Sequence, residues 1–444
     1  MVSEIDIHKR IYVNPNIVIV AISDGFYSIA NPYIKNGLKV INCRQKKTLD
    51  LFAKGESIDR VTELSKESIE DVVYFYRLLL DKQYVSDVPV FKEPCWKKTT
   101  DTLNLWVQTT NDCNLRCSYC YIHTLGQHDF FSSDRLDVFE QSLLTTVKNN
   151  NLKLVQLRLA GGEPLLRYSL WEPFFPKLRR KLSDLGCKLN LAFLSNGVAI
   201  NDRIMDFMKE NAIGIGISID GLGKYQDATR HFLNGNGSFS IVSKNIEKLV
   251  SRGFRPSLMT VITDKNIDGL TDFTHYVIDS KLHTRYSFVS GENLNINKMI
   301  AALKECYSIF EMAIENGYSF TRLHQLCDLK IDNPWFQTCS DGYNGGAIYT
   351  DGGVYFCQRH FGAISPLGSI YEDSDLLSII RRKDYYSDVS KDCIKCKFHY
   401  ICTSGCPIER VNGKDPHCEA YKELIPILYR LRGKEHLYRI KKEQ

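Results

Sequence analysis

The distribution of cysteines constrains this chain more than any other feature of its sequence. Fifteen cysteines occur in 444 residues, and the first residues lack the apolar core of a secretory signal, so we expect a cytoplasmic protein. Cytosolic thiols stay reduced, and an odd count fits full disulfide pairing poorly. Ten of the cysteines fall into an early and a late group: Cys113, Cys117, Cys120, then Cys339, Cys357, Cys393, Cys396, Cys402, Cys406 and Cys418. The sequence therefore predicts ligation of metal ions or clusters.

The overall composition is that of an ordinary soluble globular protein, with 43% hydrophobic and 25% charged residues. No run reaches 18 apolar residues, so we expect no membrane-spanning helix and no membrane partner. The net charge of +5 is too small to predict nucleic-acid binding by itself.

Apolar patterning divides the chain into four zones: 1–95, 101–316, 317–430 and a basic tail at 431–444. In the second zone, short apolar runs alternate with amphipathic stretches, which predicts six strand–helix units and a parallel sheet with right-handed crossovers. The expected strands are 103–108, 154–159, 188–194, 214–219, 257–262 and 285–289. The fold class is thus α/β, and its active site is expected at the carboxyl ends of the strands. The tail is expected to be a solvated helix.

The early group reads CxxxCxxC and directly follows the first of these strands. A 4Fe–4S cluster needs four ligands, so three cysteines leave one iron open to an exogenous chelator. A zinc site that recruits His123 as its fourth ligand is the rival interpretation, and ordinary buried cysteines are a third.

The early group, together with motifs at the next strand ends, resembles the radical SAM superfamily. Tyr119 is the aromatic residue before the third cysteine, and residues 160–164 read AGGEP, like the family's GGE motif. LSNG ends the third strand, SIDG ends the fourth, and Arg230 follows in DATRHF. The resemblance implies a partial (β/α)6 TIM-like barrel in which Cys113, Cys117 and Cys120 are the catalytic ligands of a 4Fe–4S cluster.

The same resemblance implies the cofactor S-adenosylmethionine (SAM), bound to the open iron and cleaved to a 5′-deoxyadenosyl radical that abstracts hydrogen from a substrate. Glu163 would receive the SAM ammonium beside two glycines. The residues implied to bind the cofactor are Gly161, Gly162, Glu163, Ser195, Asn196, Ser218 and Arg230. Asp220 faces the substrate or caps a helix. The reductant would be an electron donor such as flavodoxin or ferredoxin.

The late group reads C-x12-G-x4-C, then CxxCx5CxxxC, then a final cysteine. This resembles the SPASM domain and implies two auxiliary 4Fe–4S clusters, three clusters in all. Cys393, Cys396, Cys402 and Cys418 would hold one, and Cys339, Cys357 and Cys406 the other. Neither Cys306 nor Cys327 has the spacing of an eighth ligand, so the second auxiliary cluster is expected to have an open iron. A pair of zinc knuckles is the alternative.

Residues 1–95 read as a hairpin followed by three helices, a winged-helix pattern that resembles PqqD-like domains, which bind the leaders of ribosomally made peptides. A DNA-binding winged helix is the rival. The zone contains 13 Lys plus Arg and 13 Asp plus Glu, whereas DNA binding requires a basic surface. Capture of a peptide at a sheet edge needs no such charge. A purely structural cap also stays open.

These features predict a radical SAM/SPASM peptide maturase that modifies a ribosomally synthesised precursor peptide, with the leader bound by residues 1–95. A thioether crosslink from Cys sulfur to carbon is favoured, because an open auxiliary iron could hold a substrate thiolate. Carbon–carbon or carbon–oxygen crosslinking, epimerisation and anaerobic sulfatase maturation are the alternatives within the superfamily. A DNA-binding iron–sulfur redox sensor and a zinc-rich scaffold are alternatives from other classes.

Overall fold

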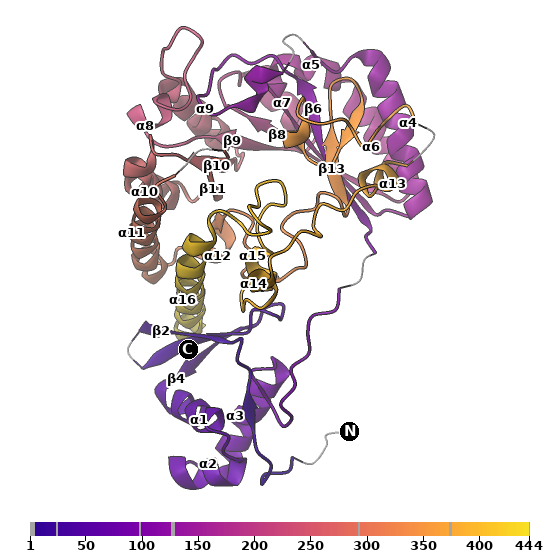
Figure 1. Cartoon of the computed structure of the whole chain (residues 1–444). Coiled ribbons are helices and arrows are strands. Elements are labelled where there is room, and N and C mark those ends of the chain that lie inside the picture. The colour runs from indigo at the N-terminus through magenta and orange to yellow at the C-terminus, as the bar shows by residue number, and fades with distance from the viewer. Residues whose placement is uncertain are drawn as a thin grey trace.

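The computed structural model describes residues 5–23, 25–96, 99–125, 129–291, 294–372 and 375–443. In Figure 1 the ten-stranded sheet and its helices lie at the top, the cysteine-rich region lies in the middle, and the N-terminal region lies at the bottom. The long C-terminal helix joins the lower two parts. Among the described residues, no helix combines the length and apolar character needed to cross a membrane.

The central sheet has the strand order β12-β11-β10-β9-β8-β7-β6-β13-β14-β15. Its six consecutive strands from β6 to β11 pair in parallel, as the sequence predicts. These six are Thr102–Thr110, Leu154–Gly161, Lys188–Ser195, Ile213–Ser218, Ser257–Ile262 and Thr284–Phe288. Each of these strands begins and ends within two residues of its predicted bounds. The flanking strands are β12 (His324–Leu326), β13 (Gly345–Ile348), β14 (Gly353–Tyr355) and β15 (Gly368–Ser369).

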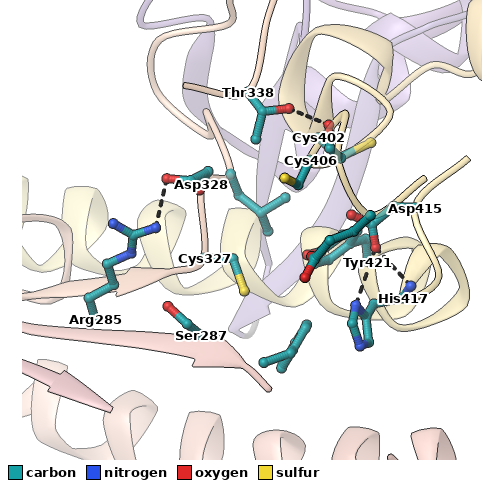
Figure 2. A pocket seen from close by; sticks show the side chains of 14 residues that line it. Arg285, Ser287, Cys327, Asp328, Thr338, Cys402, Cys406, Asp415, His417 and Tyr421 are labelled. Carbon is teal, nitrogen blue, oxygen red and sulfur yellow. Dashed lines mark hydrogen bonds and ion pairs between the residues drawn. The ribbon is translucent and has the colours of Figure 1, made fainter. Parts of the chain in front are cut away.

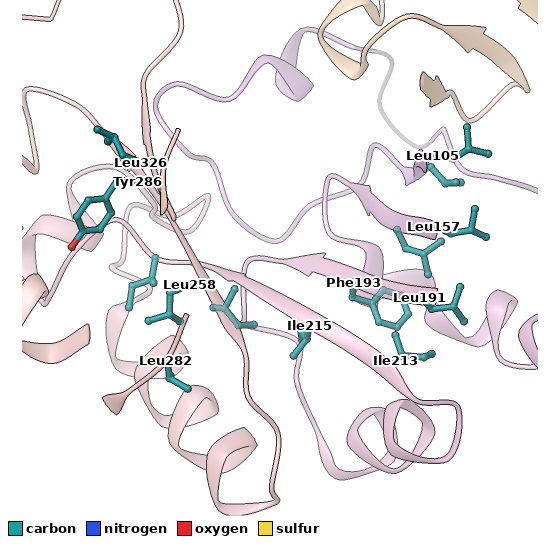
Figure 3. Packing of buried hydrophobic residues seen from close by; sticks show 14 of the residues in the cluster. Leu105, Leu157, Leu191, Phe193, Ile213, Ile215, Leu258, Leu282, Tyr286 and Leu326 are labelled. Atoms are coloured by element: carbon teal, nitrogen blue, oxygen red, sulfur yellow. The ribbon is translucent and has the colours of Figure 1, made fainter. Parts of the chain in front are cut away.

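The alternation of side chains along each strand decides which face of the sheet packs against the helices. Val155, Leu157 and Leu159 on β7 are buried in the main apolar core, because successive side chains of a strand point to opposite faces. Figure 3 shows Leu105, Leu157 and Leu191 of this core on neighbouring strands. On the opposite, inner face, Trp106, Arg158 and Ala192 are aligned across the same strands. Trp106 on this face packs against a smaller apolar cluster that includes Ala347.

Helices cover the outer face of this sheet. They are α4 (Ser133–Asn150), α5 (Tyr168–Trp171), α6 (Phe174–Asp184), α7 (Asp202–Glu210), α8 (Lys224–Asp227), α9 (Phe239–Ser251), α10 (Leu270–Ser280) and α11 (Ile296–Glu315). Short 3-10 helices occur at Tyr121–Thr124, Pro164–Arg167, Ile267–Gly269 and Gln358–His360. The expected TIM-like α/β architecture is confirmed.

The N-terminal region contains three strands in addition to the predicted hairpin. A three-stranded antiparallel sheet in the order β2-β3-β4 is formed by Val18–Ser23, Phe26–Ala30 and Leu38–Asn42. The helices α1 (Cys43–Ala53), α2 (Ile58–Ser65) and α3 (Ile69–Asp81) follow. They share a separate apolar core with this sheet, and a small sheet pairs β1 (Tyr12–Val13) with β5 (Val85–Ser86).

The cysteine-rich region has little regular structure apart from its last helix. It contains α12 (Phe320–Leu323), α13 (Leu376–Ile380), α14 (Lys391–Ile394), α15 (His399–Cys402) and α16 (Cys418–Glu443). The tail is helical as expected and is exposed at 439–443, but the expectation that it is solvated fails for its first part, because α16 runs through residue 430 without a break and buries Leu431, Gly433 and Leu437. A Cβ on Gly433 would lie 2.7 Å from that of Ser28 on β3, so this helix packs tightly on the N-terminal sheet.

Candidate active site

The three-cysteine loop emerges from the carboxyl end of β6, where parallel α/β sheets carry their sites. Burial raises the pKa of the Cys113 thiol to about 12, and Cys117 and Cys120 contribute to the same shift, so the three sulfurs share one environment. The Leu115 N–H and the Asn196 side-chain amide lie 3.4 and 3.6 Å from Cys113 Sγ. Buried thiols with N–H donors directed at sulfur are the donor set that an iron–sulfur cluster uses.

His123, the fourth ligand of the rival zinc interpretation, is engaged through one ring nitrogen, and its buried Nε2 has no hydrogen-bond partner among the described residues. Its Nδ1 lies 2.7 Å from Arg116 Nη1, and burial together with Arg116 lowers its pKa. No three His, Cys, Asp or Glu side chains of the described residues approach closely enough to hold a single metal ion. A zinc ion would require ligands about 2.3 Å away from one centre, whereas a cubane places four irons between its cysteines. The choice between a cluster and a zinc ion stays a prediction.

The two glycines of the AGGEP segment fit closely against the cysteine loop. A Cβ on Gly161 would lie 2.2 Å from the Thr110 carbonyl oxygen, and one on Gly162 would lie 2.1 Å from that of Asp112. The Gly162 N–H donates to the Thr110 oxygen at 2.7 Å. Only glycine permits this approach. The glycines therefore hold the end of β7 against the loop, in addition to any contact with a cofactor.

Glu163 is fully buried and bonded within the protein. Its carboxylate accepts hydrogen bonds from Ser195 Oγ at 2.9 Å and from the backbone N–H groups of Asn196 and Leu165 at 2.7 and 3.1 Å. Burial raises its pKa to about 7, although these donors lower it. In this arrangement Glu163 connects the ends of β7 and β8. Its expected contact with the SAM ammonium stays a prediction.

Asp220, just past β9, is fully buried. Its carboxylate accepts from Arg230 Nε at 2.9 Å, Tyr119 Oη at 2.6 Å and Thr229 Oγ1 at 2.8 Å, and from the Val261 N–H at 3.0 Å. These bonds give Asp220 a positioning role, and its expected contact with a substrate stays a prediction. Sequence reasoning missed Thr229, which no spacing rule marks.

Arg230 is the residue that this network positions. It is buried, and its Nη1 lies 3.8 Å from Cys117 Sγ. Asp220 raises its pKa against the opposing effect of burial, so the guanidinium stays charged beside the cysteine loop. A fixed cation next to three thiolates suits a site that binds an anionic cluster or a carboxylate.

The structure brings together the remaining residues predicted to bind the cofactor. Ser195 and Asn196 end β8, and the Asn196 side chain also donates to Asn114 of the cysteine loop at 2.7 Å. Ser218 ends β9 and is aligned with Met259 on β10. The carboxyl ends of four successive strands thus converge on the cysteine loop.

The mutual influence of the late cysteines on their pKa values is compatible with the two expected sets, whose assignment stays a prediction. Burial raises the pKa of Cys402 to about 12, with Cys396 and Cys418 contributing, and Cys393 acts on Cys418 in the same direction. Burial also raises the pKa of Cys357, with Cys406 contributing. Cys339 and Cys357 both feel the charge of Asp341, which raises the pKa of each thiol.

A cavity of about 100 Å³ lies between the end of β11 and the late cysteines. Figure 2 shows Cys402 and Cys406, one from each set, on one side of it, and Cys327 on the other. Arg285 and Asp328 form an ion pair at its edge, with Nη2 and Oδ1 2.9 Å apart.

Comparison with known proteins agrees with this geometry. The model of the Radical SAM superfamily matches residues 107–277. An uncharacterised protein of Methanocaldococcus jannaschii is 31% identical over 175 residues, which cover 39% of this chain and 58% of that protein. A cysteine-type anaerobic sulfatase-maturating enzyme of Clostridium perfringens is 23% identical over 349 residues, covering 72% of this chain and 94% of the enzyme.

Two groups of solved structures share the fold. The structure of anSMEcpe with bound AdoMet and the Cp18Cys peptide has a TM-score of 0.64 at 21% identity and covers 76% of this chain and 99% of its own. Streptococcus suis SuiB bound to its precursor peptide SuiA has a TM-score of 0.51 at 15% identity, with coverage of 92% and 100%. The match to the superfamily model thus identifies residues 107–277 as a radical SAM domain.

Proposed function

We propose that this enzyme modifies a ribosomally synthesised precursor peptide, forming a thioether crosslink between a Cys sulfur and a carbon atom. The observation that carries this proposal is a separate N-terminal module, with its own core, packed on the α16 helix that begins at Cys418. A radical SAM enzyme that acts on a free small molecule has no need of such a module.

The coverage of the similar structures supports the peptide substrate. The likeness to SuiB, which was solved with a precursor peptide, extends over 92% of this chain, whereas that to anSMEcpe covers 76%. We infer that residues 1–95 bind a leader peptide, as PqqD-like domains do. Among the described residues, β2 and β4 pair with no strand other than β3, so an added strand could pair with either edge of this sheet.

The residues of the site take the following proposed roles. Cys113, Cys117 and Cys120 hold a 4Fe–4S cluster, which together with SAM supplies 5′-deoxyadenosyl radical chemistry when both are bound. Arg230, kept charged by Asp220, binds an anionic group beside the cysteines. Ser218 on the inner face contacts SAM, and Gly161, Gly162, Glu163, Ser195 and Asn196 shape its pocket.

The late cysteines are proposed to hold two auxiliary clusters in a SPASM-like region. These would accept the electron that leaves when a thiol proton and a hydrogen atom are removed to form the crosslink. An electron donor such as flavodoxin or ferredoxin would reduce the enzyme.

Anaerobic sulfatase maturation is the second candidate, because this chain covers 94% of the length of the C. perfringens enzyme. It is tested by anaerobic incubation of the reconstituted chain with SAM, a reductant and a sulfatase-derived peptide in place of the precursor.

The proposal is tested by anaerobic incubation of the reconstituted full chain with SAM, a reductant and a short peptide encoded next to it. We expect release of 5′-deoxyadenosine and loss of two hydrogens from the peptide, located at a cysteine by tandem mass spectrometry. The Cys113→Ala/Cys117→Ala/Cys120→Ala variant should produce neither, and Cys95→Ala, at an exposed cysteine outside both groups, should behave as wild type. Modification of the sulfatase peptide alone would overturn the proposal in favour of the second candidate.

A further inference from the structure

The backbone pairs the cysteine loop with the segment that carries Arg230. The two residues that flank Cys117 donate their N–H groups to the carbonyl oxygens of the two residues that flank Arg230, at 2.7 and 2.9 Å. An antiparallel bridge between Leu115 and Phe232 continues this pairing in the same register. Residues between two such bonds lie directly opposite each other, with their side chains close together. The register therefore places Arg230 opposite Cys117.

The Arg230 side chain extends from Asp220 to Cys117. Its Nε lies 2.9 Å from the Asp220 carboxylate, and its Nη1 lies 3.8 Å from Cys117 Sγ. Asp220 also accepts from Tyr119 Oη at 2.6 Å, and Tyr119 belongs to the same cysteine loop. A guanidinium carries its donors in a rigid fork, so the bond that fixes Nε also fixes the direction of Nη1. The protein itself thus directs this cation at the Cys117 sulfur.

The contact is shielded from water. Arg230 and Cys117 are 8% and 9% exposed, and Asp220 is fully buried. Charges interact more strongly in such surroundings than at the surface, because little solvent screens them. A guanidinium held here therefore has a strong effect on the charge of the nearby sulfur.

A second, neutral donor is directed at another sulfur of the loop. Asn196 Nδ2 lies 3.6 Å from Cys113 Sγ, and Asn196 Oδ1 accepts from the Val198 N–H at 3.0 Å. Because the amide oxygen already faces a donor, the NH2 group is the end that faces the sulfur.

We propose that Arg230 and Asn196 donate to Cys117 and Cys113 as ligands of the 4Fe–4S cluster, and that the Arg230 charge raises the reduction potential of this cluster. The inference rests on the proposed function and deepens it, because the anionic group bound by Arg230 becomes a cluster thiolate. Hydrogen bonds to the sulfurs and net charge both set cluster potentials. Reduction adds one electron from the donor protein, so a neighbouring cation stabilises the reduced form.

The test is a potentiometric titration of the reconstituted full chain without SAM, followed by electron paramagnetic resonance. The spectrum of the Cys113→Ala/Cys117→Ala/Cys120→Ala variant is subtracted to remove the auxiliary clusters. In Arg230→Gln we expect the ratio of reduced to oxidised cluster at a fixed potential to fall roughly tenfold, which is about 59 mV for a one-electron couple. The fall should be smaller in Arg230→Lys, which keeps the charge, and in Asn196→Ala, which removes a neutral donor.

Asp220→Asn tests the sign of the effect. This variant removes an anion and keeps an oxygen acceptor, so the ratio should rise, opposite to the change in Arg230→Gln. A merely structural role would shift both variants in the same direction, because both would loosen the site. Arg203→Gln on α7 is the control, because Arg203 pairs with Glu172 at 3.1 Å, away from the cysteine loop, and it should leave the ratio unchanged.

The remaining outcomes separate the possible failures. An unchanged ratio in Arg230→Gln would overturn the inference, and weaker SAM binding by that variant would assign Arg230 to the SAM carboxylate instead. Shifts of equal sign in Arg230→Gln and Asp220→Asn would also overturn it. If Arg230→Gln takes up no iron, Arg230→Lys and Asn196→Ala decide, and wild-type ratios in both would overturn the inference. A parent chain that binds zinc and contains no sulfide would instead overturn the cluster assigned in the proposed function.

Discussion

At the scale of single residues, the site depends on buried carboxylates that bond to protein groups rather than to a ligand. Asp220 and Glu163 are both fully buried and accept four and three hydrogen bonds respectively. The sequence identifies both residues through their position after strands. It does not predict where the two carboxylates point. Whether a carboxylate binds a ligand or holds neighbouring segments together depends on hydrogen-bond donors such as Thr229 and the Val261 N–H, which come from other segments.

Replacing Asp220 should destabilise the enzyme and release the Arg230 guanidinium from its position beside Cys117. Asp220→Ala leaves the buried guanidinium and two hydroxyls without an acceptor, which should lower the free energy of unfolding by about 3 kcal/mol. Urea denaturation of the cluster-free protein measures the loss. Asp272→Ala, at an exposed position on α10, should change it by less than about 0.5 kcal/mol. Equal effects in the two variants would contradict the network.

His324 should make stability depend on pH. Burial among Phe310, Phe320 and Tyr286 lowers its pKa well below the usual 6.5. The unfolded chain therefore binds the proton first as pH falls, and the stability present above pH 6.5 is lost below it, by up to about 1.4 kcal/mol per pH unit. Urea midpoints between pH 7.5 and 5 should fall less in His324→Phe than in wild type. The exposed His275→Gln variant should retain the wild-type slope.

At the scale of elements, the sequence predicts the six central strands of the sheet but not the short strands at its edges. The six parallel strands follow from apolar periodicity alone, and their order in the sheet follows from right-handed crossovers. The strands added at the edges of the sheet cannot be predicted in this way, because β12, β13 and β15 are only two to four residues long. Segments this short carry no periodic signal, and they pair because the cysteine-rich region is folded against β6 and β11.

The contact between Gly162 and the cysteine loop gives a prediction at this scale. Gly162→Ala places a Cβ 2.1 Å from the Asp112 carbonyl oxygen, so the end of β7 has to move, at a cost of about 1–3 kcal/mol. We expect a lower urea midpoint and reduced iron uptake during reconstitution. Gly214→Ala on β9 is the matched control, because its nearest contacts would be 3.6 and 3.8 Å away. Normal iron uptake by Gly162→Ala would show that the loop tolerates the shift.

At the scale of the whole molecule, one helix connects the cysteine-rich region to the N-terminal module. The first turn of α16 contains Cys418, and its C-terminal half packs on β2, β3 and β4. The charged sequence of 431–444 predicts a solvated tail because its apolar residues are few. The structure buries Leu431, Gly433 and Leu437 and leaves 439–443 exposed, and glycine at 433 allows the sheet to approach closely.

Widening this contact should loosen the N-terminal module without affecting the barrel. Gly433→Val pushes against Ser28 and Ile22, and overpacking of about 1–3 kcal/mol should speed local opening roughly tenfold or more. Hydrogen exchange should therefore accelerate in β2 to β4 and stay unchanged in β6 to β8. Lys442→Val, at an exposed position near the end of the same helix, should leave both unchanged. Uniform acceleration across the chain would mean that the two parts unfold as one unit.

The close packing of α16 on the N-terminal sheet also has a geometric consequence. A module that cannot slide holds the leader at a constant distance from the barrel opening, so the enzyme would act as a ruler along its peptide. The position that reacts would then be set by the number of residues between the recognised segment and the target, and lengthening that spacer would move the modification by the same number of residues.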